Sequence, residues 1–584
     1  MRFNVLALDY DGTIAQDGVL DAAVRQAIAE ARAHGVTVVL VTGRILDDLR
    51  QVMGDLRLVD AVVAENGAVL AFPAAGRTIV LAPPASERLL MELRRRGIEA
   101  RSGACVIETA ADHAGDVLDA VRALELPLAL LFNRQRLMVL PQAVSKATGL
   151  REALAALRLS THNAIGIGDA ENDHELLAVC EIGVAVAWGS TTLVWVADEV
   201  IAGTGPPAVA AYIRRVVRDR RLPEVRAPRR RLLLGVEADG NRPLELAETG
   251  RNVLVAGDPR SGKSWVTGLL CEQLMLARYC VCVIDPEGDY RTLEALPGVH
   301  VLGGLSTPPS PAEVVQALRY PDVSVLIDLS SVAHVDKVDY LGAVLPALRA
   351  WRERTGLPHR IVVDEAHYFL YGPQVEAMVD LDMGGYTLVT YRASSLDPSV
   401  RRAAEAIVVT RITDEREAAA LAQTFGEGET GHWQRLLATL TIGEAALLPT
   451  VVEAGGCLRR FRLAARLTSH IRHRQKYLDV PVPTHLAFYF PEIGAPAGQH
   501  ARTLAEFIGF LVCAPREALD GHLRRHDFSR WLRDVYRDAP LAMEIHLLEE
   551  AYAQGRRLDV NDALAQIIRD RYDFSGDADA TGLP

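Results

Sequence analysis

Two aspartates stand two positions apart directly after an apolar segment near the start of the chain. The segment Phe3–Leu8 is typical of a buried strand, and it runs into Asp9, Tyr10 and Asp11. Residues i and i+2 of an extended chain project to the same side, at the strand end where open α/β sheets place their ligands. Two carboxylates held this close are costly unless a cation lies between them, and oxygen ligands favour Mg²⁺. The pattern therefore predicts a Mg²⁺ site.

Further polar residues follow two later strands of the same region, at 36–41 and 164–167, and one lysine precedes a predicted helix. They are Thr42, Lys146, Asp169, Asn172 and Asp173. Strands that alternate with helices form a parallel sheet, and the carboxyl ends of parallel strands meet at one sheet edge. We therefore expect these side chains to lie beside the first two aspartates.

A glycine-rich loop separates a predicted strand, residues 252–256, from a helix that begins near Trp265. The loop reads G-x-x-x-x-G-K-S, and its residues are Gly257, Asp258, Pro259, Arg260, Ser261, Gly262, Lys263 and Ser264. Its glycines allow backbone N–H groups to surround phosphates at the positive end of the following helix. In this strand–loop–helix setting, Lys263 would reach the β- and γ-phosphates of ATP and Ser264 would bind Mg²⁺.

A later apolar strand, 360–363, ends in two adjacent acids, Asp364 and Glu365. Asp364 would hold the Mg²⁺ shell, and Glu365 would orient and deprotonate the attacking water. A glutamate in this place favours ATP hydrolysis over transfer of the phosphoryl group to a small molecule.

Composition limits the classes of protein to which the chain can belong. Its 584 residues are too many for one core and predict about three or four domains. A net charge of −12 excludes a basic field over the whole chain for gripping nucleic acid. Seven cysteines, none in a C-x-x-C pair, argue against a disulfide framework or a cysteine-bound zinc site. The sequence shows neither a signal peptide nor an apolar span of membrane length, so we expect a cytoplasmic protein without membrane insertion.

Lysine is nearly absent from the chain. Of 63 basic residues only four are lysines, namely Lys146, Lys263, Lys337 and Lys476. A compact ammonium group is not replaced by a planar guanidinium at a tight phosphate site. The remaining lysines are therefore the first candidates for chemistry, and two of them lie in the motifs described above.

The first set of motifs resembles the haloacid dehalogenase (HAD) phosphohydrolases, and within them the Cof-type branch, which also matches at 65–68. The resemblance implies that Asp9 attacks phosphorus to form an aspartyl-phosphate and that Asp11 acts first as acid and then as base. Thr42 and Lys146 would hold the phosphoryl group in transfer. The implied Mg²⁺ ligands and their supports are Asp9, the main-chain carbonyl of Asp11, Asp169, Asn172 and Asp173. Residues 83–141 stand where this branch carries its cap domain, and they are short for such a cap, which favours a small phosphoester such as a sugar phosphate.

The second set of motifs resembles the HerA/FtsK-type ATPases, with further likeness in the acidic turn 285–290 and the lead-in 234–237. The resemblance implies a homo-oligomer, commonly a hexameric ring that moves DNA or protein, and it places Arg411 near the nucleotide. Tyr391 stands where these relatives carry a polar amide, which puts translocation in doubt more than ATP hydrolysis. The arginine that acts in trans stays open among Arg392, Arg401, Arg402 and Arg411.

The predicted fold class is α/β with a helical C-terminal part. A Rossmann-like HAD core spans 1–82 and 142–217, and a small α+β cap with a hairpin at 128–140 spans 83–141. A basic linker at 218–231 leads to a RecA-like P-loop ATPase domain at 232–465. Residues 466–584 hold the end of an arginine-rich segment, 459–476, then a helical domain and a frayed tail. Within the helical domain, Asp527 is expected to be the N-cap of a helix.

Three hypotheses about function follow. In the first, both sites turn over, and the ATPase is an oligomeric motor on nucleic acid. In the second, the ATPase is a switch that regulates the phosphatase without DNA. In the third, the protein is a scaffold whose HAD part only recognises a phosphorylated ligand.

Overall fold

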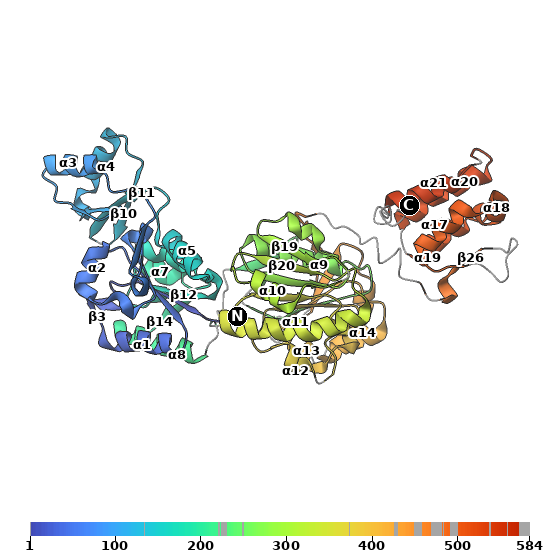
Figure 1. Cartoon of the computed structure of the whole chain (residues 1–584), viewed down its shortest axis with the longest axis horizontal. Helices are drawn as coiled ribbons and strands as arrows, with labels where there is room; N and C mark the ends of the chain where they lie inside the picture. The colour runs from blue at the N-terminus through green and yellow to red at the C-terminus, as the bar shows by residue number, and fades with distance from the viewer. Residues whose placement is uncertain are drawn as a thin grey trace, which may run out of the picture. The chain divides into compact units, whose positions relative to one another are not determined.

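The computed structural model describes residues 2–133, 135–219, 222, 230–247, 250–305, 307–372, 374–424, 430–448, 458–468, 482, 484–490, 500–536, 539–557 and 559–571. These residues fall into two compact units, Met1–Ser469 and His470–Pro584. Most of the predicted linker, the second half of the arginine-rich segment with Lys476, and the C-terminal tail lie outside the described residues. Figure 1 shows the elements of each unit.

The first unit begins with an eight-stranded sheet in the order β14-β13-β12-β1-β4-β5-β6-β7. Its parallel strands are β1 (Val5–Leu8), β4 (Thr37–Val41), β5 (Ala61–Ala64), β12 (Ala164–Gly168), β13 (Ile182–Val186) and β14 (Glu199–Ile201). Two antiparallel strands, β6 (Val69–Phe72) and β7 (Arg77–Val80), complete one edge.

Helices cover both faces of this sheet because the side chains of β1 alternate between two cores. Leu6 and Leu8 pack in one core with α1 (Ala22–Ala33) and α8 (Pro206–Asp219), which lie side by side. Val5 and Ala7 pack in the other with α5 (Lys146–Leu157) and α6 (His174–Val179). The predicted Rossmann-like arrangement is therefore confirmed for this part.

The segment between the two halves of this sheet forms the predicted small α+β cap (Figure 1). Its four-stranded sheet has the order β10-β11-β9-β8. The predicted hairpin is confirmed as β10 (Leu128–Asn133) paired antiparallel with β11 (Arg136–Pro141), and Arg134 in its turn lies outside the described residues. The other elements are β8 (Arg101–Ser102), β9 (Ile107–Ala110), α3 (Glu87–Arg95) and α4 (Ala114–Ala123).

A second, 11-stranded sheet follows in the order β16-β15-β25-β24-β23-β17-β22-β21-β18-β20-β19. Its parallel strands are β17 (Val253–Ala256), β18 (Val281–Asp285), β19 (Val299–Gly303), β20 (Ser324–Asp328), β21 (Arg360–Val363), β22 (Tyr386–Thr390) and β23 (Ala406–Val409). The antiparallel edge consists of β15 (Arg231–Glu237), β16 (Pro243–Ala247), β24 (Glu444–Leu448) and β25 (Arg459–Leu463). Helix α9 (Lys263–Leu276) packs on one face, and α10 (Pro311–Ala317) and α11 (His334–Thr355) pack on the other.

The two α/β parts of the first unit meet at the amino ends of their strands. Asn163, directly before β12, donates to the carbonyl of Gly356 at 3.4 Å, and its Oδ1 lies 3.1 Å from Nε2 of His359, directly before β21. Nε2 of His162 lies 2.9 Å from the carbonyl of Ala277. The carboxyl ends of both sets of strands, where ligands bind in such sheets, therefore point away from this interface.

Glu181 is the buried acid at the centre of this interface. It lies 2.8 Å from Nδ1 of His162 and 2.8 Å from Nε of Arg230, and it accepts a hydrogen bond from the hydroxyl of Tyr279 at 3.0 Å. Burial acts to raise the pKa of Glu181, but the hydrogen bond from His162 and the charge of Arg230 outweigh it and lower that pKa.

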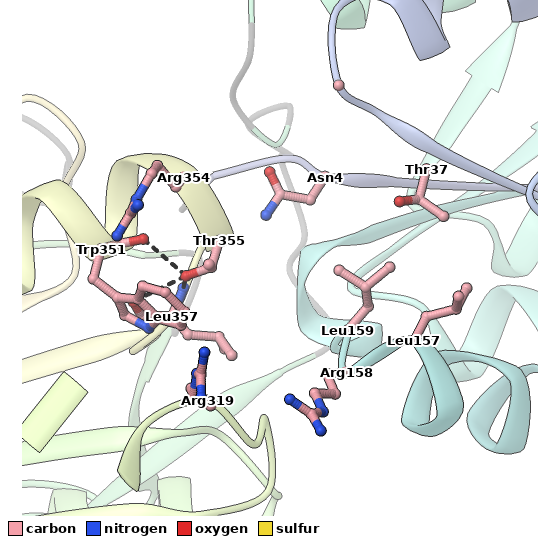
Figure 2. A pocket seen from close by; sticks show the side chains of 11 residues that line it. Asn4, Thr37, Leu157, Arg158, Leu159, Arg319, Trp351, Arg354, Thr355 and Leu357 are labelled. Atoms are coloured by element: carbon pink, nitrogen blue, oxygen red, sulfur yellow. Dashed lines mark hydrogen bonds between the residues drawn. The ribbon is translucent and has the colours of Figure 1, made fainter. Parts of the chain in front are cut away.

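A cavity of about 300 Å³ also opens between the two α/β parts. It is lined by Asn4 and Thr37 on one side and Trp351 on the other (Figure 2).

The second unit is helical in its described residues, apart from the short pair β26 (Phe488–Tyr489) and β27 (His500–Ala501). Its helices are α17 (Leu504–Cys513), α18 (Arg516–Arg524), α19 (Asp527–Asp534), α20 (Ala539–Ala553) and α21 (Asn561–Arg571). Phe488, Phe507 and Phe528 lie at the centre of its core. Among the helices described in either unit, none combines the length and apolar character needed to cross a membrane.

The expected N-cap at Asp527 is wrong. His526 is the capping residue, and the Asp527 side chain instead contacts His522 and Arg525. The first N–H groups of α19 are satisfied by Glu549 of α20, which accepts from the backbone of Phe528. A carboxylate from another helix has taken the place of the local cap.

Candidate active site and nucleotide-binding loop

Lys146 joins two of the predicted carboxylates at the carboxyl edge of the first sheet. Its Nζ donates to Oδ1 of Asp9 and to Oδ1 of Asp173, each at 2.6 Å, and its side chain is 1% exposed. Burial acts to lower the pKa of Lys146, but the carboxylates of Asp173 and Asp9 outweigh it and raise that pKa. The ammonium group is therefore a fixed positive charge beside Asp9.

Close approach of the backbone places Lys146. It is the first residue of α5, where Ser145 and Thr148 form a reciprocal capping box. Gly67 has φ +109°, and a Cβ atom at this position would lie 2.0 Å from the carbonyl oxygen of Ser145. The glycine of the 65–68 motif is therefore required for the start of α5 to reach the site.

Three buried carboxylates form a cluster that fits a divalent cation. Oxygens of Asp9, Asp169 and Asp173 all lie within 4.8 Å of one another. Burial raises the pKa of Asp9 well above its usual range, and the charge of Asp173 raises it further, although Lys146 acts in the opposite direction. One ammonium group among three carboxylates leaves negative charge that Mg²⁺, with its preference for oxygen, would balance. The residues present therefore fit the predicted metal.

Asp173 also orders the loop that follows β12. Its Oδ2 accepts from the backbone N–H groups of Asp169 and Ala170, both at 3.0 Å. Asp169 in turn accepts from the hydroxyl of Thr13 at 3.3 Å. These contacts hold Asp169 toward Asp9, as predicted from the strand ends.

Asp11 lies at the same edge but has a partner that was not predicted from the sequence. Arg44 donates from Nε to Oδ2 of Asp11 and from Nη2 to Oδ1, each at 2.6 Å. The hydrogen bond with Asp11 raises the pKa of Arg44, and the pair is only partly shielded from solvent. Arg44 was not among the site residues predicted from the sequence, and nothing in its spacing indicates this pairing.

Thr42 follows β4 at the site and is buried. Its hydroxyl accepts from the backbone N–H of Arg44 at 3.1 Å, which fixes the turn that carries Gly43. A Cβ atom at Gly43 would lie 3.2 Å from the sulfur of Met138, a cap residue, and 3.5 Å from Nδ2 of Asn172. The cap therefore reaches over the loop after β4. Among the described residues, Nδ2 of Asn172 is buried without a hydrogen-bond partner.

Glu65 fastens the cap to the core. Its side chain accepts from three consecutive cap N–H groups, those of Ala104 at 2.9 Å, Cys105 at 2.8 Å and Val106 at 3.3 Å. The residue is buried and has φ +51°. The motif at 65–68 was noted for its likeness alone, and the role of Glu65 in the cap became visible only in the structure.

The glycine-rich loop has the expected strand–loop–helix setting, between β17 and α9. Arg260 and Gly262 both have positive φ, +63° and +110°. A Cβ atom at Gly257 would lie 1.9 Å from the hydroxyl of Thr410, so that position also requires glycine. Lys263, the first residue of α9, donates to the carbonyl of Asp258 at 2.9 Å across the loop. The hydrogen bond from Lys263 to Asp258 thus closes the loop on itself.

Acidic residues gather at the neighbouring strand ends. Ser264 donates to Oδ2 of Asp289 at 2.7 Å, and Asp289 donates its N–H to Oδ1 of Asp285 at 2.9 Å. Burial raises the pKa of Asp285 well above its usual range, and the charges of Asp289 and Asp364 act in the same direction. A serine hydroxyl among crowded carboxylates fits Mg²⁺. Asp289 was not among the predicted ligands, although the acidic turn was noted.

Asp364 and Glu365 follow β21, which a single strand, β22, separates from β17. Asp364 accepts from the N–H of Glu365 at 2.8 Å, and Glu365 has φ +48°. Oε2 of Glu365 lies 3.6 Å from Nδ1 of His367. Both acids are buried, and they lie on the same sheet edge as the loop.

Arg411 and Tyr391 also lie near the loop. The N–H of Asp258 donates to the carbonyl of Arg411 at 2.7 Å, and Nε of Arg411 lies 4.0 Å from Oδ2 of Asp258. Nζ of Lys263 lies 5.9 Å from the ring centre of Tyr391. The ring of Tyr391 therefore lies beside the lysine of the glycine-rich loop.

The described part of the arginine-rich segment is used inside the fold. Arg460 pairs with Glu444 at 2.6 Å, and Arg466 pairs with Glu272 of α9 at 2.8 Å with its side chain fully buried. Arg459 lies 3.9 Å from Glu237. These three arginines form ion pairs in and beside β25, so within the described residues 458–468 their charges are balanced by glutamates of the same unit.

Comparison with known proteins gives relatives for the first part of the chain. The family model described as haloacid dehalogenase-like hydrolase matches residues 6–110 and 125–213. A phosphoglycolate phosphatase from Methanopyrus kandleri is 25% identical over 239 residues, which are 37% of this chain and 98% of that protein. A phosphoglycolate phosphatase from Halorubrum lacusprofundi is 31% identical over 224 residues, which are 36% of this chain and 96% of that protein.

Solved structures also match this part of the chain. A haloacid dehalogenase-like hydrolase from Bacteroides thetaiotaomicron is 16% identical and covers 37% of this chain and all (100%) of its own, with a TM-score of 0.33. The crystal structure of the protein 0175 from Thermoplasma acidophilum is 16% identical and covers 37% and 99%, also with a TM-score of 0.33. The residues matched by the family model end at 213, so the glycine-rich loop at 257–264 lies outside them.

Proposed function

Because the chain belongs, through its N-terminal part, to the haloacid dehalogenase-like hydrolases, we propose that this part is a Mg²⁺-dependent phosphomonoesterase with Asp9 as nucleophile. One observation carries the proposal: the ammonium group of Lys146 lies 2.6 Å from Asp9 in a buried cluster with Asp169 and Asp173. A carboxylate beside a fixed positive charge can attack phosphorus while the charge that develops on the phosphoryl oxygens is stabilised.

The proposed reaction has two steps. An oxygen of Asp9 forms a bond to phosphorus as the bond to the leaving alkoxide breaks, and Asp11 gives its proton to that alkoxide. Asp11 then takes a proton from water, whose oxygen attacks the aspartyl-phosphate and releases phosphate. Thr42 and Lys146 hold the phosphoryl oxygens throughout. Mg²⁺ bound by Asp9, Asp169 and the main-chain carbonyl of Asp11 would supply Lewis-acid stabilisation of the phosphoryl charge.

The proposed substrate is a small phosphoester. The two curated relatives carry the name phosphoglycolate phosphatase, which makes 2-phosphoglycolate the first compound to test. Met138 of the cap approaches the loop after β4, and we propose that this small cap is matched to a small leaving group. Sugar phosphates form the second group of compounds.

The test compares Asp9→Asn with Asp17→Asn, an exposed aspartate outside the cluster. With Mg²⁺, the intact protein and Asp17→Asn should hydrolyse both p-nitrophenyl phosphate and 2-phosphoglycolate. Asp9→Asn should lose at least about 10³-fold in kcat, because the attacking oxygen is replaced by an amide. Full activity of Asp9→Asn would refute the covalent mechanism. Absence of activity in the intact protein on every phosphoester would favour the scaffold hypothesis.

A second function, ATP hydrolysis, is favoured by the loop 257–264 beside the acids that follow β18 and β21. In this proposal Lys263 binds the β- and γ-phosphates, and Asp364 and Ser264 hold Mg²⁺. Glu365 orients the attacking water. Arg411 supports the loop through its carbonyl and is a candidate for contact with the nucleotide.

ATP binding and hydrolysis can be tested separately. Lys263→Ala should lose nucleotide binding, whereas Glu365→Gln should keep binding and lose hydrolysis. If Glu365→Gln hydrolysed ATP as fast as the intact protein, the role proposed for Glu365 would be refuted. Failure of the intact protein to bind MgATP would refute the nucleotide site as a whole.

The output of the ATPase is proposed as a switch on the phosphatase, with a hexameric DNA motor as the alternative. Pairing of Arg460 and Arg466 with glutamates leaves fewer unbalanced positive charges in the described residues 458–468, on which a motor would depend. Phosphatase rates that change with ATP would support the switch. ATP hydrolysis that accelerates with DNA, from a hexamer in light scattering, would support the motor.

A further inference from the structure

Two histidines and a buried glutamate converge in the second unit, far along the chain from both phosphate sites. They are His526, His546 and Glu549, and one ligand atom from each lies within 4.8 Å of the other two. Neither the phosphatase nor the ATPase proposal uses them. Imidazole and carboxylate groups in such a cluster are the ligand types of transition metals rather than of Mg²⁺.

The fold presents these residues from two helices that pack together. His546 and Glu549 stand three positions apart on α20, so they lie on one face of that helix. His526 directly precedes α19 and has φ +56°. The rings of His526 and His546 have centroids 4.6 Å apart. The contact between α19 and α20 thus brings the three side chains together.

One carboxylate oxygen of Glu549 accepts hydrogen bonds, and the other accepts none from the described residues. Its Oε1 accepts from the N–H groups of Phe528 at 3.0 Å and Ser529 at 3.3 Å, which satisfies the start of α19. Its Oε2 is buried and has no hydrogen-bond partner among the described residues, and the same holds for Nδ1 of His526. A buried polar atom without a partner costs free energy, and a bound ligand would remove that cost.

The two unpartnered atoms face each other at the spacing of metal ligands. Oε2 of Glu549 and Nδ1 of His526 are 3.6 Å apart, too far for a hydrogen bond. Two ligands of one tetrahedral zinc ion, each about 2.0–2.1 Å from the metal, lie about 3.4 Å apart. A simple ion pair would leave His546 without a role, whereas a shared metal uses all three residues.

We propose that His526, His546 and Glu549 form a zinc site in the second unit. Nδ1 of His526, a ring nitrogen of His546 and Oε2 of Glu549 would bind Zn²⁺, and the fourth position would be open to water or another exchangeable ligand. The scarcity of cysteine pairs excludes only zinc sites built on thiolates, and this site needs none. Oε1 of Glu549 keeps the carboxylate in place through the backbone of α19.

The experiment measures zinc in the full-length protein. The protein is saturated with ZnCl₂ in excess MgCl₂, which occupies the oxygen-rich phosphate sites, then dialysed and analysed by plasma mass spectrometry. His526→Asn, whose side chain tolerates a positive φ, and His546→Ala should each retain one equivalent of zinc less than the intact protein. His522→Gln is the matched control, because His522 contacts Asp527 in the same unit and lies outside the trio; it should retain zinc in full.

A second readout distinguishes lost ligands from lost folding. Co²⁺ in a low-coordinate site with nitrogen ligands absorbs visible light far more strongly than Co²⁺ among six oxygens. The intact protein and His522→Gln should show this absorption, and the two ligand variants should lose it while keeping their helical circular dichroism. Equal zinc content and equal absorption in the intact protein, His526→Asn and His546→Ala would overturn the proposal.

Discussion

Arg44 holds both carboxylate oxygens of Asp11, each at 2.6 Å, beside the proposed nucleophile. A guanidinium group that donates to both oxygens of a carboxylate fixes the orientation of that carboxylate. Asp11 is the proposed acid of the first step, so Arg44 is a positioning residue that must release or shift its hold when Asp11 takes up a proton. The orientation of Asp11, and with it the rate of the first step, should therefore depend on Arg44.

Arg44→Gln should separate substrates by their leaving groups. We expect kcat/KM for 2-phosphoglycolate to fall about tenfold, because its alkoxide needs the proton of a positioned Asp11. For p-nitrophenyl phosphate, whose phenolate leaves without a proton, the change should stay below about twofold. The ratio kcat/KM is the correct measure because it covers the steps up to the aspartyl-phosphate. An equal loss on both substrates would mean that Arg44 binds the phosphoryl group instead.

Lys146→Met should cost both activity and stability. The substitution leaves Asp9 and Asp173 buried without their cation, and breaking a buried ion pair in this way costs about 3–5 kcal/mol. Urea unfolding in EDTA should show this loss, and added Mg²⁺ should recover more stability in Lys146→Met than in the intact protein. A variant as stable as the intact protein in EDTA would contradict the buried bridge.

Glu65→Gln should loosen the cap. The amide nitrogen of glutamine cannot accept the hydrogen bonds of the Cys105 and Val106 N–H groups, and a buried donor left unpaired costs about 1–3 kcal/mol. Hydrogen exchange of the amides at 104–106 should therefore become about tenfold faster or more. Glu99→Gln, at an exposed cap position, serves as control. Unchanged exchange in Glu65→Gln would show that the cap is held elsewhere.

Stability of the first unit should fall on acidification through His359. Burial lowers the pKa of His359 well below 6.5, and the charges of His162 and Arg352 act in the same direction. Its Nδ1 accepts from the N–H of Cys280 at 2.8 Å, so the folded state holds the neutral ring, which also faces Tyr279. The unfolded chain binds a proton near pH 6.5, and the folded state does not. The contribution of His359 is therefore complete above about pH 6.5 and falls by up to about 1.4 kcal/mol per pH unit below it.

His359→Asn isolates this effect from other groups that titrate. Its side-chain oxygen can accept from the same N–H group but takes up no proton. The free energy of unfolding measured between about pH 7.5 and 5.5 should decline less steeply in this variant. Parallel curves for the two proteins would show that His359 is not responsible.

The strands and the two sets of motifs could be predicted from local sequence. Apolar runs closed by polar residues gave β1, β4, β12, β17 and β21, and residues at their ends were correctly expected to share sheet edges. Periodicity and motif spacing report such local features directly. The conserved geometry of a parallel sheet then supplied the relation of Asp9 to Asp169 and Asp173.

Contacts between side chains far apart in the chain could not be predicted in this way. Nothing near Asp11 indicates its pairing with Arg44, and nothing near Glu65 indicates three N–H donors from the cap. The expected cap at Asp527 was wrong because Glu549, from the next helix, supplies the acceptor. Each of these contacts depends on how packed elements meet, which single-sequence patterns do not encode.

The interface formed by Asn163 and His359 lies before the strands, whereas Asp9 and Lys263 lie after them. In the two proposed functions, orthophosphate formed at Asp9 would therefore leave at the end of the sheet that points away from this interface, and not toward Lys263. Inhibitors that bind beside Asp9 and beside Lys263 would therefore not exclude one another. Any coupling between the two proposed reactions would have to be conformational. A movement of the strands in one α/β part would reach the other part through the contacts at their amino ends.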